Sequence, residues 1–197
     1  MTADFPVVLD ACVLANFGVC DLFLRLAEHP RLYTPRWSEK ILSEVNRTHL
    51  RKLKWPRKLA DSFQEKIRMS FPEASITGYE PLITKLKNHR KDRHVLAAAV
   101  KGHVPVIVTF NLKDFPESAL APWGVKVVHP EEYLLNLYEM HPAVVMGKIS
   151  AISKRDGNDL EKTILNLGIS LKLFASKILE DMGMEDGSRI PNPRKRS

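Results

Sequence analysis

Short apolar runs alternate with segments of helical periodicity along the first 130 residues of the chain. Residues 6–9 form an apolar run that ends at Asp10, and residues 105–109 and 125–128 are similar runs. Such runs are typical of strands buried in a parallel sheet. The segment 92–102 has Asp at its start, alanines inside and Gly at its end, which predicts a helix. Strand, helix and strand with short connections predict a parallel α/β sheet.

Three other segments before residue 130 repeat apolar side chains at helical spacing. The first contains Leu22 and Phe23 and stops at Pro30, and the second begins near Ser38 and passes Val45. The third covers residues 57–70. The apolar side predicted for this third helix consists of Leu59, Phe63, Ile67 and Met69.

After Pro130 the strand pattern stops and only helical periodicity remains. Helices are predicted over residues 131–140, 143–154, 158–167 and 170–182. The chain of 197 residues is long enough for one domain with a smaller appendage. We therefore expect an α/β domain over residues 1–130 and a helical C-terminal extension over 131–184. The basic tail, 185–197, lacks apolar periodicity and is predicted to be disordered.

Composition excludes several classes of protein. With 44% hydrophobic residues the chain can bury a core, but it has no stretch of about 18 apolar residues that would span a membrane. The N-terminus has Asp4 where a signal peptide would carry Lys or Arg. Two cysteines are too few for a disulfide framework or a structural zinc site. These features predict a cytoplasmic protein with no membrane partner.

Positive charge is concentrated in two segments of a chain whose formal net charge is +7. Residues 47–68 carry eight Lys or Arg against two acidic residues, and residues 85–93 carry five against one. Either segment could be a solvated helix face. Each could also contact the phosphates of a nucleic acid, which basic segments commonly bind.

Acidic side chains occur at the ends of the predicted elements. Asp10 follows the first strand, Asp92 begins a helix, and Asn111 and Asp114 follow the strand at 105–109. In an open parallel sheet the crevice at the carboxyl ends of the strands collects such residues. Asp92 could instead be only an N-cap, and Asp114 could only shape a turn. Asp10 is harder to explain structurally, because a buried charge is costly unless a cation or hydrogen-bond donors compensate it.

The helix that begins near Ser38 offers two further carboxylates. Trp37, Ile41 and Val45 form a stripe that should face the core. At about 100° per residue, Glu44 lies roughly 60° from the centre of this stripe and Glu39 roughly 160° away. Glu44 is therefore expected at the edge of the core, and Glu39 in solvent.

Several carboxylates in one crevice would repel one another unless a divalent cation neutralised them. Mg²⁺ and Mn²⁺ both accept oxygen ligands, so the ligand type does not choose between them. A water bound to such a metal can attack a phosphodiester. An acidic centre within a basic chain is thus chemically consistent with a nuclease.

Four segments taken together resemble a known family. VVLDACVLANF, SEVNR, DRHVLAAAV and VIVTFNLKDF are similar, in order, to the motifs of PIN-domain ribonucleases, and especially of the VapC-type toxins of toxin–antitoxin modules. The resemblance covers about residues 5–130. It implies a three-layer α/β/α fold around a parallel sheet of five strands. The segment after residue 130 resembles the helical extension of a longer VapC-like subgroup.

The resemblance also implies roles for individual residues. The catalytic acids would be Asp10, Glu44, Asp92 and Asp114, of which Asp10, Asp92 and Asp114 would bind Mg²⁺ or Mn²⁺. Thr109 and Asn111 would position the substrate or support the acids. The chain departs from the family in having Ala11 and Cys12 where Thr or Ser and then Asn are usual, and in having Asn at position 111. Cys12 is interpreted as a packing residue, because Mg²⁺ disfavours sulfur.

The resulting hypothesis is a metal-dependent endoribonuclease that acts as the toxin of a type II toxin–antitoxin system. Its implied partners are RNA, a VapB-like antitoxin protein and a second copy of the chain in a homodimer. The alternative is a catalytically silent RNA-binding module that keeps the fold, which the departures at positions 11, 12 and 111 would favour. A receiver domain would need an early acidic pair and a late Lys, and neither is present.

Overall fold

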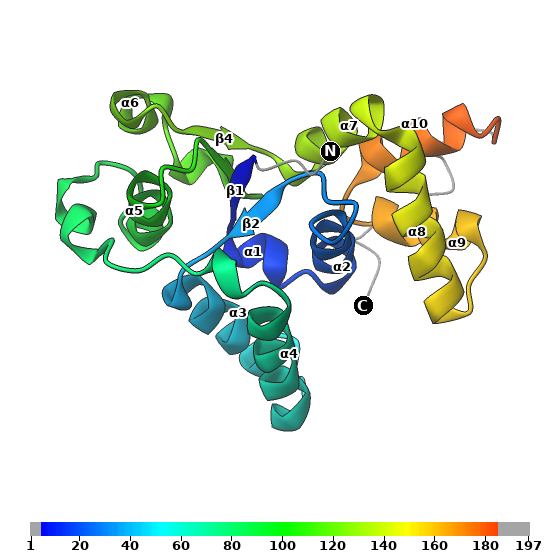
Figure 1. Ribbon diagram of the computed structural model, residues 1–197, viewed down its shortest axis with the longest axis horizontal. Helices are drawn as coiled ribbons and strands as arrows, with labels where there is room; N and C mark the ends of the chain where they lie inside the picture. The colour runs from blue at the N-terminus through cyan, green and yellow to red at the C-terminus, as the bar shows by residue number, and fades with distance from the viewer. Residues whose placement is uncertain (1–4, 185–197) are drawn as a thin grey trace. The chain divides into compact units, whose positions relative to one another are not determined.

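The computed structural model describes residues 5–184. They contain a four-stranded parallel sheet in the order β2-β1-β3-β4 (Figure 1). The strands are β1 (Pro6–Leu9), β2 (Thr34–Arg36), β3 (Val106–Val108) and β4 (Lys126–Val128). The predicted α/β class with a parallel sheet is confirmed. The three strands expected from apolar runs are β1, β3 and β4.

β2 has no signal in the sequence analysis, because its residues Thr-Pro-Arg do not form an apolar run. Its pairing with β1 defines it, with Pro6 opposite Thr34 and Val8 opposite Arg36. A strand of three residues held by tertiary pairing is below the length at which periodicity can be recognised.

A fifth strand is not shown among the described residues, and a single parallel bridge between Trp37 and Ser75 lies beside the end of β2. Trp37 N–H donates to the Ala74 carbonyl at 2.9 Å, and Ile76 N–H donates to the Trp37 carbonyl at 2.8 Å. Backbone groups of a strand alternate in direction, so Pro35 and Trp37 face the same outer edge of β2. Pro35 has no N–H to donate, which limits the extension of this ladder.

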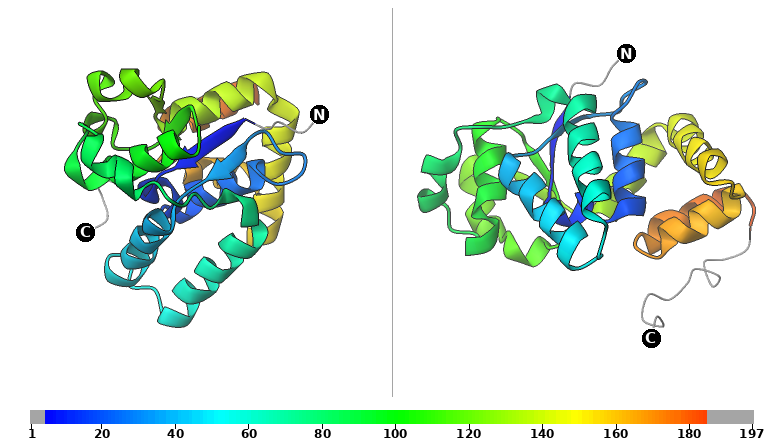
Figure 2. Two further views of the ribbon diagram at one scale, coloured as in Figure 1. Left: turned by 60° about the vertical axis from the view of Figure 1, so that its left-hand side comes forward. Right: turned by 90° about the horizontal axis from the view of Figure 1, so that it is seen from below.

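Helices follow the strands in the sheet-containing part of the chain. They are α1 (Ala11–Leu14), α3 (Glu39–Arg51), α4 (Arg57–Ser70), α5 (Arg93–Lys101) and α6 (Glu117–Leu120), with short 3-10 turns between them. Figures 1 and 2 show α5 on one side of the sheet and α1 on the other. The predicted start of α3 is confirmed, because the Ser38 hydroxyl caps it by accepting from Ile41 N–H at 3.3 Å.

The apolar side predicted for α4 is partly wrong, although the bounds of the helix are as expected. Leu59 and Met69 are exposed, whereas Ala60, Gln64 and Ile67 are buried. Gln64 occupies a core position because its amide donates to the Leu42 carbonyl of α3 at 3.1 Å. A hydrogen bond between helices thus sets the buried face, and hydropathy alone could not predict it.

The described residues divide into two compact units. One contains residues 5–16 and 33–129, which hold the sheet. The other contains residues 17–32 and 130–184. Its helices are α2 (Phe17–Leu26), α7 (Pro130–Met140), α8 (Pro142–Asp156), α9 (Leu160–Gly168) and α10 (Lys172–Asp181). The four predicted C-terminal helices are therefore present.

Contacts between α2 and the C-terminal helices explain why α2 belongs to the helical unit. Phe23 of α2 stacks on Tyr133 of α7 with ring centroids 5.9 Å apart. Asp21 of α2 accepts from Arg155 of α8 at 2.9 Å. The domain boundary expected at residue 130 stays a prediction, and the tail at 185–197 lies outside the described residues. Among residues 5–184, none of the helices combines the length and the apolar character of a membrane-spanning segment.

Candidate active site

Neighbouring strands bring Asp10 and Thr109 together. β1 pairs with β3 so that Leu9 lies opposite Val108, the last residue of each strand. Asp10 directly follows β1, and Thr109 directly follows β3. The Thr109 hydroxyl donates to Asp10 Oδ2 at 2.6 Å, and Ala11 N–H donates to Asp10 Oδ1 at 2.6 Å. Asp10 is 3% exposed. The cost of burying this carboxylate is therefore offset by donors from both strand ends.

Cys12 contributes polar contacts to this pair and is not only a packing residue. Its thiol donates to Asp10 Oδ2 at 3.3 Å and lies 3.2 Å from the Thr109 hydroxyl oxygen. Phe110 N–H donates to its sulfur at 3.3 Å. Burial, together with the charge of Asp10, raises the pKa of Cys12 to about 12. The thiol therefore keeps its proton and serves as a hydrogen-bond donor beside the carboxylate.

Asp92 precedes α5 in the N-cap position, but its side chain makes no capping hydrogen bond. Instead, Oδ2 of Asp92 lies 3.0 Å from Nδ1 of His89, three residues earlier. The purely structural interpretation of Asp92 as a helix cap is thus not what the geometry supports.

A cluster of possible metal ligands forms around Asp92. One ligand atom each from His89, Asp92 and Asp114 lies within 4.8 Å of the others. The backbone N–H of His89 donates to the backbone carbonyl of Asp114 at 3.0 Å, which holds the two segments together. Burial raises the pKa of Asp92, and the charges of Asp10 and Asp114 raise it further, while His89 acts in the opposite direction. The charges of Asp10 and Asp114 therefore both act on the Asp92 carboxylate.

Glu44 lies outside this cluster but next to the helix that follows it. Glu44 Oε1 is 3.3 Å from Nε2 of His94, which is buried in the first turn of α5. Lys40 and Arg47 lie 3.9 and 3.8 Å from the same oxygen. Burial acts to raise the pKa of Glu44, but His94, Lys40 and Arg47 together lower it below its ordinary value. Glu44 is therefore an ionised carboxylate at the edge of the core.

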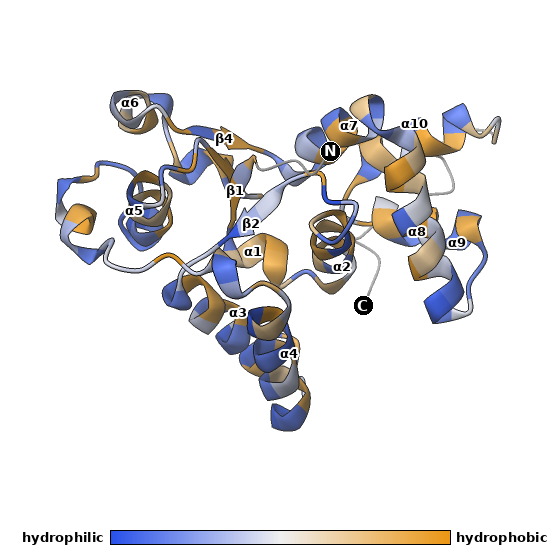
Figure 3. Ribbon diagram, viewed as in Figure 1, coloured by the Kyte–Doolittle hydropathy of each residue, from blue (hydrophilic) through white to orange (hydrophobic). Residues whose placement is uncertain are grey.

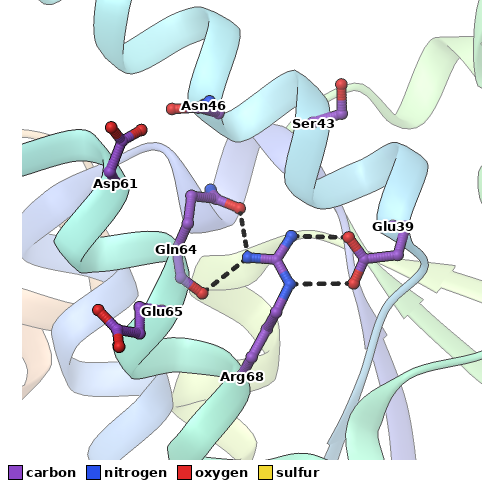
Figure 4. A pocket seen from close by; sticks show the side chains of 7 residues that line it. All are labelled: Glu39, Ser43, Asn46, Asp61, Gln64, Glu65 and Arg68. Carbon is purple, nitrogen blue, oxygen red and sulfur yellow. Dashed lines mark hydrogen bonds and ion pairs between the residues drawn. The ribbon is translucent and has the colours of Figure 1, made fainter. Parts of the chain in front are cut away.

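Glu39 points to a different partner. Its carboxylate accepts two hydrogen bonds from the Arg68 guanidinium, at 3.1 and 2.6 Å (Figure 4). Arg68 also donates to the Gln64 carbonyl and side chain. These residues line a polar cavity of about 440 Å³ between α3 and α4. Glu39 is exposed and Glu44 half-buried, as the helical geometry predicts.

Asn111 contributes its backbone to the site. Its N–H donates to the Thr109 hydroxyl at 3.1 Å, and its carbonyl accepts from Asp114 N–H at 3.0 Å. The residue itself is exposed. The structure thus pairs Asp10 with Thr109 and groups Asp92 and Asp114 with His89. Asp10 acts on Asp92 through its charge but is not one of the clustered ligand residues, and Glu44 contacts His94 of α5.

Two histidines were missed in the sequence analysis. His89 lies in a segment that the sequence analysis described only as basic. His94 lies in a helix that was predicted from its alanines and its end residues, without attention to the histidine. The spacing of His89 and Asp92 is a usable signal, since residues three apart face each other across one helical turn. His94 had no comparable signal, because its partner Glu44 is fifty residues earlier in the chain.

The donor set fits a divalent cation. Carboxylate oxygens suit Mg²⁺ and Mn²⁺, and an imidazole nitrogen suits transition metals. Burial is the main cause of the raised pKa of Asp92, and a cation would relieve the repulsion from Asp10 and Asp114 that adds to it.

Comparison with known proteins gives one informative match. No model of a protein family matches the chain, and no solved structure matches it. The chain is 47% identical over 78 residues to a curated protein of Mycobacterium tuberculosis named "Putative ribonuclease VapC50". This match covers 38% of the chain and 46% of that protein, so it spans about half the length of the relative. Over the shared segment the chain is a homologue of a VapC-named protein, which confirms its resemblance to VapC-type PIN-domain proteins.

Proposed function

We propose that the protein is a metal-dependent endoribonuclease that cleaves RNA phosphodiester bonds. The observation that carries this proposal is the convergence of Asp10, Asp92 and Asp114 from separate elements, together with His89, in a chain homologous to a ribonuclease-named protein. A purely structural cluster would have no reason to place two further carboxylates where their charges disfavour the ionisation of Asp92.

Asp10, Asp92 and Asp114 would bind Mg²⁺ or Mn²⁺, with His89 as a further ligand. The bound cation supplies a water of lowered pKa and stabilises negative charge on the phosphate during the reaction. Thr109 and Cys12 orient the Asp10 carboxylate by donating to Oδ2. Asn111 orients Thr109 through its backbone N–H.

Glu44 is assigned the removal of the proton from the attacking water. It is ionised, because His94, Lys40 and Arg47 lower its pKa. His94 fixes the carboxylate beside the start of α5, where Asp92 also lies. A carboxylate with a lowered pKa is a weak base, so its contribution depends on position more than on basicity.

Cleavage of RNA by purified protein tests the proposal. We expect products with Mn²⁺ or Mg²⁺, none with EDTA, and none from Asp92→Asn. Asp61→Asn removes an exposed carboxylate on α4 and serves as the matched control, which should cleave normally. Full activity of Asp92→Asn would contradict the assignment. Binding without cleavage under every condition would favour the silent RNA-binding module.

We further propose that the protein is the toxin of a type II toxin–antitoxin pair. This rests on the VapC name of the homologue. Its partner would be a VapB-like antitoxin that inserts a basic side chain into the acidic site, and the toxin would form a homodimer. Induced expression should arrest growth, and Asp92→Asn should not. Growth unaffected by the wild-type chain, at a level where the purified protein cleaves RNA, would contradict the toxin role alone.

A further inference from the structure

Six exposed cations gather where α3 turns into α4. We call them the α3–α4 cation cluster, and they are Arg47, Arg51, Lys52, Lys54, Arg57 and Lys58. The segment 47–58 contains no acidic residue. Figure 1 shows the two helices extending away from the sheet, and α4 is largely hydrophilic in Figure 3. The cluster thus lies on a projecting part of the sheet-containing unit.

Most of this charge is not neutralised within the protein. Among residues 5–184, Arg47 is the one member with an acidic partner, and its distance to Glu44 Oε1 is 3.8 Å. Other arginines of the chain are paired closely, such as Arg68 with Glu39 at 2.6 Å and Arg155 with Asp21 at 2.9 Å. The other five cations have no acidic partner among residues 5–184 and repel one another, so a polyanion would bind here favourably.

The turn that carries the cluster is held in a fixed conformation. Leu53 N–H donates to the Thr48 carbonyl at 3.0 Å, and Trp55 N–H donates to the His49 carbonyl at 2.9 Å. Trp55 stacks on the buried His49 with ring centroids 3.9 Å apart. Lys54 adopts a φ of 56°, which is unusual for a residue with a side chain. The cations are therefore presented on a preformed surface, which reduces the entropy lost on binding.

A row of α3 residues connects this cluster with the candidate active site. Lys40, Glu44, Arg47 and Arg51 are spaced by four, three and four residues, which places them on one helical face. At 1.5 Å per residue, Arg51 lies about 10 Å along the helix from Glu44. A nucleic-acid strand bound along this row of side chains would therefore pass Glu44.

We propose that the α3–α4 cation cluster binds the phosphate backbone of a single RNA strand, on one flank of the bond that is cut. This inference rests on the proposed function. The three carboxylates of the site repel a polyanion, and the cluster provides the compensating attraction nearby. Trp55 is half-exposed among the cations, and an aromatic ring beside cations is the combination that binds single-stranded nucleic acid.

Binding without cleavage provides the first test. We would measure the affinity of a fluorescent single-stranded RNA of about 20 nucleotides in EDTA, over a series of salt concentrations. The variant combines Arg51→Gln, Arg57→Gln and Lys58→Gln. Each lost phosphate contact lowers the slope of log Kobs against log salt by about 0.7, so we expect a slope about 2 units shallower and binding at least about 10-fold weaker at low salt.

The matched control combines Lys154→Gln, Lys162→Gln and Lys172→Gln, which removes the same charge from exposed positions of the helical unit. It should keep the wild-type slope. An equal loss in both variants would mean that net charge alone drives binding, and an unchanged slope in the cluster variant would mean that RNA binds elsewhere. Either result overturns the proposal. Equal thermal unfolding of the three proteins shows that all are folded.

Cleavage in Mn²⁺ provides the second test. The cluster variant should cleave the long RNA with a raised KM and unchanged kcat, and it should cleave an oligonucleotide of about four residues as the wild type does. A lowered kcat on the short substrate would contradict a role confined to docking. If the wild type cleaves nothing, the proposed function fails, and the binding measurement still decides whether the cluster holds RNA.

Discussion

Thr109 carries the most specific hydrogen bond of the candidate site, because its hydroxyl donates to the buried Asp10 carboxylate at 2.6 Å. Thr109→Val keeps the shape of the side chain and removes the donor. Loss of a donor to a buried charged group costs about 1–3 kcal/mol in the free energy of unfolding. Urea denaturation should report a loss in this range for Thr109→Val and a smaller one for Thr109→Ser. Equal losses would assign the role to packing.

If His89 is a metal ligand, it should change the relative affinity of the site for Mn²⁺ and Mg²⁺. An imidazole ligand favours Mn²⁺ over Mg²⁺ relative to a site built from oxygens alone. We expect His89→Ala to weaken Mn²⁺ binding about 10-fold or more and Mg²⁺ binding much less, as measured by calorimetric titration. His141→Ala, which changes an exposed histidine of the helical unit, is the control. Equal weakening for both metals would mean that His89 only positions Asp92.

At the scale of single residues, the sequence was sufficient to predict the acidic residues of the site but not the residues that donate hydrogen bonds to them. Asp10, Asp92 and Asp114 are recognisable because each stands at the end of a regular element. Their hydrogen-bond donors are distant in sequence, as with Thr109 and Asp10, or of unexpected type, as with Cys12. Such partners depend on strand register, which short apolar runs do not specify.

His49 couples the α3–α4 pair to pH. Burial lowers its pKa below the ordinary 6.5, against the opposing effect of the Ala15 carbonyl. The unfolded chain therefore binds a proton more readily than the folded chain. Stability from this group is complete above the ordinary pKa and falls as pH drops below it.

We therefore expect the melting temperature to fall between about pH 7.5 and pH 5, and to fall less in His49→Phe. Phe preserves the stacking on Trp55 without a titratable ring. Thermal unfolding followed by circular dichroism at several pH values measures the difference. The same fall in both proteins would show that His49 does not contribute, and His103→Gln, at an exposed position, controls for the loss of a histidine.

Elements with strong local signals were predicted well, and those defined by contacts were not. α5 has its alanines inside and Gly102 at its C-terminal end, as expected, although Asp92 takes the N-cap position without a capping hydrogen bond. β2 forms because its backbone pairs with the edge of β1, and its three residues show no apolar periodicity of their own. The grouping of α2 with the C-terminal helices likewise depends on Phe23, Asp21 and their distant partners.

For the whole molecule, the acidic cluster should lower stability in the absence of metal. Because the pKa of Asp92 is raised in the fold, its ionised form is favoured in the unfolded chain, and stability from this group decreases as pH rises above the ordinary pKa of Asp. We expect Asp92→Asn without metal to melt at or above the wild-type temperature near neutral pH. A clearly lower melting temperature would contradict this account and indicate that Asp92 has a structural role.

With metal present, the wild type should melt at a higher temperature than Asp92→Asn. A cation that binds only the folded protein stabilises it by mass action. A Mn²⁺ titration that follows both RNA cleavage and melting temperature therefore tests the central claim most directly. The account predicts that both rise with the same midpoint in the wild type, and that neither responds in Asp92→Asn. Cleavage that is independent of Mn²⁺, or that persists in Asp92→Asn with the wild-type midpoint, would contradict it.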